Sequence, residues 1–169
     1  DLTDLIQTDP LLSSALPETR YYYGNGRIAG LNTAVEVSLL FYNKDLFDKA
    51  GVSYPPADPA KAWTWAEFVD AAQKLTVDAD GKHPTDEVFD ATKTATYGAA
   101  FDKIYEGWTF YPFIFSNGGQ VVNESGTQLL LDSPEAVEAI QSLADLMWVQ
   151  HVAPTPAQDN NLPGYVTMF

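Results

Sequence analysis

The sequence predicts an α/β fold, and two neighbouring features carry that prediction. Residues 34–42, AVEVSLLFY, are almost all apolar or aromatic, which is typical of a strand covered on both faces of a parallel or mixed sheet. Directly after them, Asn43 suits a helix N-cap, residues 44–50 have a helical composition, and Gly51 suits a helix end. A strand that leads straight into a helix indicates an α/β arrangement.

Composition and charge exclude several classes of function. The chain has 169 residues, 46% of them hydrophobic and 13% aromatic, which is enough for a packed core. Its formal net charge of −14 argues against binding to nucleic acid or to an anionic membrane, because both need clustered Lys and Arg. The absence of cysteine excludes disulfides, thiolate metal sites and thiol nucleophiles.

A tight turn is predicted before the apolar run. Gly24-Asn25-Gly26 is a strong turn signal that leads into a strand beginning near Ile28. The three tyrosines before it, residues 21–23, suit either a binding wall or ordinary core and rim packing.

Two further helices are signalled by their N-terminal caps. Thr64 and Glu67 form the pattern of a capping box. Ser133-Pro134 places a proline at the first position of a second helix. We expect the core-facing residues to be Trp65, Phe68, Val69, Ala72 and Leu75 in the first helix and Val137, Ile140, Leu143, Ala144, Met147 and Trp148 in the second.

Shorter elements are predicted between these helices. Residues 95–100 suit a short strand, and residues 109–116 suit a buried helix that stops at Asn117-Gly118-Gly119. Residues 120–123 and 128–131 read as two short strands joined by a turn.

The acidic loop over residues 76–96 resembles a calcium-binding loop in part. When Gly81 is aligned with the glycine of an EF-hand loop, Asp78 and Asp80 fall at the third and fifth ligand positions and Glu87 at the twelfth. Thr76 occupies the first position, where an acid is expected. The loop is therefore either a calcium site or a solvated acidic turn.

Two carboxylates stand out against apolar surroundings. Glu36 interrupts the apolar run, and Glu106 precedes Trp108 in an aromatic segment. Carboxylates accept hydrogen bonds from vicinal hydroxyls and an indole stacks on a pyranose, so the three residues together suit a sugar. The alternatives are that Glu36 is paired with Lys or Arg while Trp108 is core, or that the two acids form a glycosidase pair, which requires them to be about 5–10 Å apart.

Several short segments occur in a specific order along the chain. They are YGNGRIAGL (23–31), Glu36 followed by YNKDLFDKAG (42–51), TWAEF (64–68), Tyr97-Gly98, residues 113–119, LDSPEA (131–136) and Val152-Ala153-Pro154. In this order they resemble the extracellular substrate-binding proteins of carbohydrate ABC importers, the class of maltose-binding protein.

The resemblance implies part of a two-lobe, periplasmic-binding-protein-like (Venus-flytrap) α/β fold that closes at a hinge over its ligand. It would place residues 1–33 at the end of the first lobe, residues 34–42 in a crossover strand at the hinge, and residues 43–169 in an incomplete second lobe. Because members of the class are roughly twice this length or more, it also implies a fragment, mostly of the second lobe.

Binding residues can be carried over at matching positions. Glu36 matches an acidic crossover position that contacts sugar hydroxyls in maltose-binding relatives. Glu106 and Trp108 match an acid and an aromatic residue that bind and stack on sugar there, although Trp replaces a tyrosine and leaves the identity of the sugar open. We expect Tyr111 to be a further ligand-binding residue and Asn32, which stands where a proline is common, to add a hydrogen-bonding group at the hinge.

The expected function is to bind an extracellular carbohydrate, an oligosaccharide given the many aromatic residues, and to deliver it to ABC permease subunits. No catalysis, no nucleic acid and no cofactor other than calcium is expected. The protein would be extracellular, periplasmic or a cell-surface lipoprotein, with its export signal and any lipid anchor outside these residues. The alternatives are a glycoside-acting enzyme that uses Glu36 and Glu106, or a binding protein of the same fold for a non-sugar solute.

Overall fold

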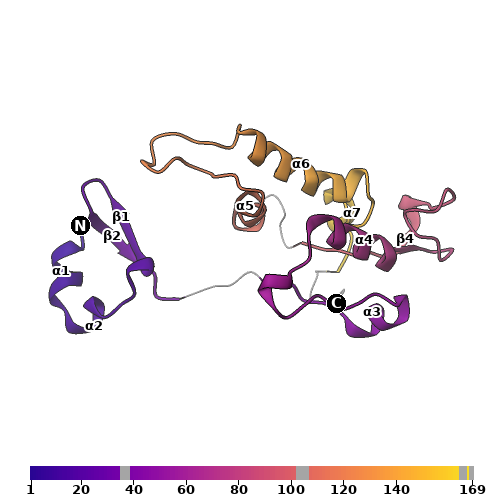
Figure 1. Ribbon diagram of the computed structural model, residues 1–169, viewed down its shortest axis with the longest axis horizontal. Helices are drawn as coiled ribbons and strands as arrows, with labels where there is room; N and C mark the ends of the chain where they lie inside the picture. The colour runs from indigo at the N-terminus through magenta and orange to yellow at the C-terminus, as the bar shows by residue number, and fades with distance from the viewer. Residues whose placement is uncertain (35–38, 102–106, 164–166, 168–169) are drawn as a thin grey trace. The chain divides into compact units, whose positions relative to one another are not determined.

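The computed structural model of the chain describes residues 1–34, 39–101, 107–163 and 167. Backbone contacts divide the chain into two compact units, Asp1–Phe41 and Tyr42–Phe169 (Figure 1). Within the described residues the strands form two short antiparallel pairs, β1–β2 and β3–β4. No helix in this part of the chain is long and apolar enough to cross a membrane.

The first unit is a β-hairpin packed with short helices. Its elements are α1 (Thr3–Thr8), α2 (Pro10–Ser13), the 3-10 turn η1 (Pro17–Thr19), β1 (Arg20–Tyr23) and β2 (Arg27–Leu31). The predicted turn before Ile28 is confirmed: Asn25 and Gly26 have φ of 63° and 73°, a left-handed conformation that these two residue types tolerate best. Ile6 of α1 and Ile28 of β2 are buried, whereas the three tyrosines of β1 are exposed.

The prediction of a buried strand over residues 34–42 is wrong in the part that the structure describes. Ala34 and residues 39–42 are not in a strand, and Leu39, Leu40 and Phe41 are 67%, 58% and 76% exposed. A strand that is buried on both faces needs neighbouring strands, and no strand among the described residues pairs with this run. Residues 35–38, which include Glu36, lie outside the described residues.

The second unit contains most of the helices. Its elements are α3 (Lys44–Ala50), the 3-10 turn η2 (Pro59–Lys61), α4 (Trp65–Leu75), β3 (Val77–Asp78), the 3-10 turn η3 (Ala91–Lys93), β4 (Thr94–Thr96), α5 (Gly107–Ser116), α6 (Pro134–Trp148) and α7 (Pro156–Asp159). Local side-chain chemistry explains where three of these helices begin.

The helix starts predicted from the sequence are confirmed. The Asn43 side chain accepts hydrogen bonds from the backbone N–H groups of the first turn of α3, and Ser133 accepts one at the start of α6. Thr64 and Glu67 form the complete capping box of α4. Gly51 ends α3 with a φ of 66°, as a left-handed C-cap requires.

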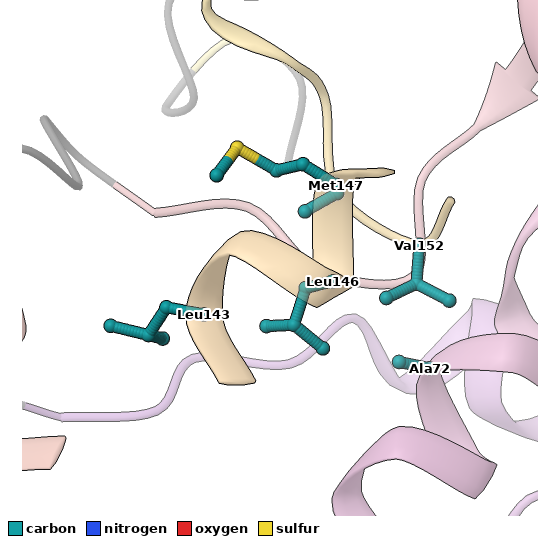
Figure 2. Packing of buried hydrophobic residues seen from close by; sticks show 6 residues of the cluster. Ala72, Leu143, Leu146, Met147 and Val152 are labelled. Atoms are coloured by element: carbon teal, nitrogen blue, oxygen red, sulfur yellow. The ribbon is translucent and has the colours of Figure 1, made fainter. Parts of the chain in front are cut away.

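The core of the second unit lies between α4, α5 and α6. Figure 2 shows Leu146 of α6 between Leu143 and Val152, with Ala72 of α4 beside Val152. A second cluster joins Ile114 of α5 to Ala136 and Ala139 of α6. These two clusters fix α5 against α6.

The core-facing side of α6 differs from the predicted one. The buried residues of α6 are Ala136, Ala139, Leu143, Leu146 and Met147. Of the predicted stripe, Leu143 and Met147 are buried, but Val137, Ile140 and Trp148 are 52%, 40% and 61% exposed. Ala136 and Ala139 face Ile114 of α5, whereas Val137 and Ile140, which follow them in the sequence, are exposed.

Three of the predicted strands differ from what the structure shows: one is shorter, and two are replaced by a single bridge. The strand predicted over residues 95–100 is observed as β4, which covers residues 94–96. It pairs with β3, a strand in the acidic loop that the sequence did not predict. Residues 120–123 and 128–131 form one isolated bridge, between Val122 and Leu129, in place of two strands. Short exposed segments such as these have too few neighbours to extend a ladder.

A long excursion of the chain, orange in Figure 1, connects α5 to α6. Asn117, just after α5, donates its side-chain N–H to Glu135 O at 2.9 Å and to Glu138 Oε2 at 3.1 Å. The end of α5 is therefore bonded directly to the first turns of α6, on the far side of the excursion.

Candidate functional site

The structure describes only part of the predicted sugar site. Glu36 and Glu106 lie outside the described residues, and of Trp108 the structure describes the backbone, as the second residue of α5, and not the side chain. The proposed convergence of the two carboxylates and the indole therefore stays a prediction. Tyr111 and Asn32 can be placed.

Tyr111 lies on α5, one turn after Trp108, and its ring is partly buried. It packs against the cluster of Ile114, Ala136 and Ala139. It also makes an edge-to-face contact with Phe110, with ring centroids 4.8 Å apart and an angle of 83°. The ring therefore contributes to the packing of α5 on α6.

Phe113 of α5 belongs to an aromatic cluster with Trp65 and Phe68 of α4 and with Phe101. Phe113 of α5 makes edge contacts with Trp65 at 5.9 Å and with Phe101 at 5.7 Å, and Phe68 of α4 lies 5.4 Å from Trp65. Phe68 packs on the core as the sequence predicts, whereas Trp65, also predicted to face the core, is 37% exposed. The contacts of these rings with α5 were not predicted. The signal was the density of aromatic residues around residues 101–113, which periodicity alone cannot assign to partners.

Asn32 follows β2 in the first unit and is exposed. Its backbone N–H donates to Thr19 O at 2.7 Å, and its side-chain Oδ1 accepts from the Ala34 N–H at 3.4 Å. These bonds hold a local turn at the end of the hairpin. A ligand-binding role for Asn32 stays a prediction.

The predicted calcium ligands are not brought together. In the part of the chain that the structure describes, no group of three or more His, Cys, Asp or Glu side chains is arranged to hold a metal ion. Asp78 is buried, and its carboxylate accepts backbone N–H bonds from Asp80 and Lys82 at 2.9 Å each and from Asp90 at 3.0 Å. This carboxylate binds amides of its own loop, and a calcium-binding role for Asp78, Asp80 and Glu87 stays a prediction.

The same hydrogen bonds favour the ionised form of the Asp78 carboxylate. The N–H groups of Asp90, Lys82 and Asp80 hold the pKa of Asp78 below its usual value, because they stabilise the ionised carboxylate. The hydroxyl of Thr92 and the ammonium of Lys93 lower the pKa of Asp90 in the same way. Asp78 thus links both ends of the acidic loop while it remains ionised.

Comparison with known proteins finds one matching family model and several related binding proteins. Residues 2–169 match the family model described as bacterial extracellular solute-binding protein. An arabinooligosaccharide-binding protein of Halalkalibacterium halodurans is 29% identical over 132 residues, which is 78% of this chain and 25% of the relative. One of Bacillus subtilis is 27% identical over 167 residues, which is 98% of this chain and 33% of the relative.

Two solved structures share the fold. The ABC substrate-binding protein of Listeria monocytogenes in complex with cycloalternan matches with a TM-score of 0.58 and 30% identity, over 96% of this chain and 38% of that one. UspC of M. tuberculosis matches with a TM-score of 0.54 and 31% identity, over 71% of this chain and 30% of that one.

These matches show the fold of the chain and how much of its relatives' length it covers. The chain has part of the periplasmic-binding-protein fold. It spans about a quarter to a third of the length of the two curated relatives. Because the family model extends over almost all of its residues, the chain belongs to the bacterial extracellular solute-binding protein family.

Proposed function

We propose that the chain is part of a protein that binds an oligosaccharide outside the cell and delivers it to the permease of an ABC importer. The observation that carries this proposal is the match over 96% of the chain to a substrate-binding protein solved with cycloalternan. Two relatives named for arabino-oligosaccharides point to the same ligand class. The net charge of −14 is compatible with a neutral ligand.

The proposed mechanism is closure of two lobes at a hinge. A sugar that contacts both lobes favours the closed state by the difference between its affinities for the closed and open states. Residues 1–33 would belong to the first lobe, residues 34–42 to the hinge and residues 43–169 to the second lobe. The change of contact pattern between Phe41 and Tyr42 supports a boundary within the proposed hinge.

The proposed binding residues have distinct roles. Glu36 near the hinge and Glu106 before α5 would accept hydrogen bonds from sugar hydroxyls, and Trp108 would stack on a sugar ring. Asn32 would add a polar group at the hinge. The position of residues 107–116 in a helix held by two core clusters supports a rigid base for Trp108.

The proposed location is the periplasm or the cell surface, with attachment by a lipid anchor outside these residues as one form of retention. Membership of an extracellular family supports this location. The proposed protein has no catalytic activity, because its relatives are named as binding proteins.

The proposal is tested by calorimetric titration of the protein at its natural full length. The ligands are arabino-oligosaccharides, malto-oligosaccharides and cycloalternan, with arabinose and a tripeptide as controls. We expect one oligosaccharide class to bind with a Kd of about micromolar or tighter, and the controls to bind at least about 100-fold more weakly. Binding of the peptide alone would instead identify a non-sugar solute.

A parallel incubation separates binding from catalysis. The oligosaccharide that binds best is kept with the protein, and newly formed reducing ends are measured. We expect none above the level without protein. Release of product that is lost in Glu36→Gln and Glu106→Gln variants would establish the glycosidase alternative.

A further inference from the structure

The chain contains two Asn-Gly pairs, and the fold places them in different surroundings. Asn25 is followed by Gly26, and Asn117 is followed by Gly118. In such a pair the backbone nitrogen of the glycine can attack the side-chain amide carbon of the asparagine, because glycine has no side chain to obstruct the approach. Whether this happens in a folded protein depends on how freely the two groups can rotate toward each other.

Asn25 lies at the tip of the hairpin, next to the last residue pair of its ladder, Tyr23 with Arg27. It is exposed, and among the described residues no hydrogen-bond partner is found for its side-chain amide. A Cβ atom placed on Gly24 or Gly26 would meet no described atom within 4 Å apart from the adjoining residues. The tip therefore has room for the amide and the next peptide group to rotate.

Asn117 has the same neighbour in sequence, but both of its reacting groups are held. Its side-chain amide donates to Glu135 O at 2.9 Å and to Glu138 Oε2 at 3.1 Å. The nitrogen that would attack, that of Gly118, donates to Phe115 O at 3.1 Å. Rotation of either group must first break hydrogen bonds that join α5 to α6, so the reactive geometry is reached only by local opening.

We propose that Asn25 is a site of spontaneous deamidation in the folded protein and that the fold protects Asn117. The Gly26 nitrogen forms a bond to Asn25 Cγ and gives its proton to solvent, and the side-chain nitrogen of Asn25 leaves as ammonia. The product is a five-membered succinimide. Water then opens the ring at either carbonyl group and gives aspartate or isoaspartate, so water is the only co-reactant.

The two products affect the hairpin differently. Both place a carboxylate at its tip. Aspartate leaves the backbone unchanged, and it tolerates the left-handed conformation of residue 25, whose φ is 63°. Isoaspartate adds a methylene group to the main chain, and because turn length fixes the register of a hairpin, we expect it to loosen the pairing of Tyr23 with Arg27.

The test follows both pairs in the same protein, kept folded at its natural full length in mildly alkaline buffer. Trypsin releases residues 21–27 and a glutamate-specific protease releases residues 107–124, so each pair is read on its own peptide. Deamidation raises the peptide mass by the difference between water and ammonia, and enzymatic methylation identifies isoaspartate. We expect Asn25 to convert at least about tenfold faster than Asn117. Equal rates, or a faster Asn117, would overturn the proposal.

The same measurement in denaturant separates the fold from the sequence. In the unfolded chain neither pair is held, and we expect the two asparagines to convert at similar rates because each precedes a glycine. If the difference between them were as large in denaturant as in the folded protein, it would belong to the neighbouring residues, and the protective role of the fold would be wrong.

A matched pair of variants tests the protection of Asn117 directly. Glu138→Ala removes one acceptor of its amide, whereas Glu135→Ala is the control because the acceptor there is the backbone carbonyl oxygen, which remains. Melting temperatures verify that both variants stay folded. We expect Glu138→Ala to accelerate conversion of Asn117 and to leave Asn25 unchanged, and Glu135→Ala to alter neither rate. An unchanged rate at Asn117 in Glu138→Ala, or equal acceleration in both variants, would contradict protection by this hydrogen bond.

Discussion

Gly98 lies against the backbone of Ala72, so closely that a Cβ atom on residue 98 would overlap the Ala72 carbonyl group. The Gly98 N–H donates to Thr76 Oγ1 at 2.9 Å, and the Thr76 hydroxyl donates to Ala72 O at 2.8 Å. Thr76 is fully buried. The segment after β4 is thereby bonded to the last turn of α4.

We expect Gly98→Ala to destabilise the second unit by about 3 kcal/mol or more, because the methyl group meets backbone atoms that cannot rotate away. Chemical denaturation followed by circular dichroism measures this change. Ala66→Gly, at an exposed position of α4, is the control and should cost no more than about 1 kcal/mol. Equal costs would show that residue 98 has room for a side chain.

The observed orientation of α6 predicts opposite outcomes for two of its apolar residues. Leu146→Ala should cost about 2–5 kcal/mol, because Leu146 is fully buried among Leu143, Ala72 and Val152. Ile140→Ala, on the same helix at 40% exposure, should cost less than about 1.5 kcal/mol. Denaturant titration compares the two, and the reverse ranking would restore the face predicted from the sequence.

The hydrogen bonds of Asp78 predict a dependence of stability on pH. Because its folded pKa is below the ordinary value of 3.8, its contribution is present above pH 3.8 and is lost as the pH falls through the folded pKa. Asp78→Asn should therefore lower the melting temperature at pH 7 and have a smaller effect at the acid end. Glu124→Gln, in an exposed turn, is the control and should change the melting temperature little at neutral pH.

The hydrogen bond of Tyr54 predicts that stability falls as the pH rises in the alkaline range. Its hydroxyl donates to Asp48 Oδ1 at 2.6 Å, and this bond to a carboxylate raises the pKa of Tyr54 from 10.0 to about 12. Its contribution is therefore complete below pH 10.0 and is lost as the pH rises to about 12. The tyrosinate difference spectrum between the unaltered protein and Tyr54→Phe should show this late ionisation, and Asp48→Asn should move it to lower pH.

The proposed stacking residue gives a direct prediction for ligand affinity. Trp108→Ala should weaken oligosaccharide binding by about 1–3 kcal/mol, because a sugar face loses its aromatic surface. Trp108→Phe should retain part of the affinity. Calorimetric titration measures both variants in the protein at its natural full length, and an unchanged affinity in Trp108→Ala would remove the residue from the site.

Features that depend on neighbouring residues were predictable from the sequence. The caps at Asn43, Thr64 and Ser133 and the end at Gly51 are confirmed because each is a contact within one turn of chain. The same holds for the hairpin turn at Asn25 and Gly26, where backbone conformation selects the residue types. Local chemistry is sufficient for such features.

Features that depend on distant partners were not predictable. Residues 39–41 have the composition of a buried strand, yet burial requires other strands that the run itself cannot specify. On α6, the large side chains of Val137 and Ile140 suggested the core face, whereas Ala136 and Ala139 form it because α5 approaches closely. Asp78 illustrates the same limit, since the sequence did not predict that backbone N–H groups of its own loop donate to its carboxylate.

The site was predictable only in part for the same reason. Residue types suggested Glu36, Glu106 and Trp108 as a sugar site, and the family resemblance added Tyr111. Neither indicated the contact of Tyr111 with Gly107. That contact depends on the absence of a side chain, which carries no signal in a search for functional groups. The contact is recognised only in the structure, where the two residues lie one helical turn apart on α5.

The bonds of Asn117 have a consequence for the excursion between α5 and α6. Since Asn117 donates to Glu135 and Glu138, the two ends of the excursion are already held together by the helices they join. The closure entropy of such a loop grows only slowly with its length. The tip around Ser125 and Gly126 is thus a suitable place to graft an epitope or a fluorescent reporter without rebuilding the helical scaffold beneath it.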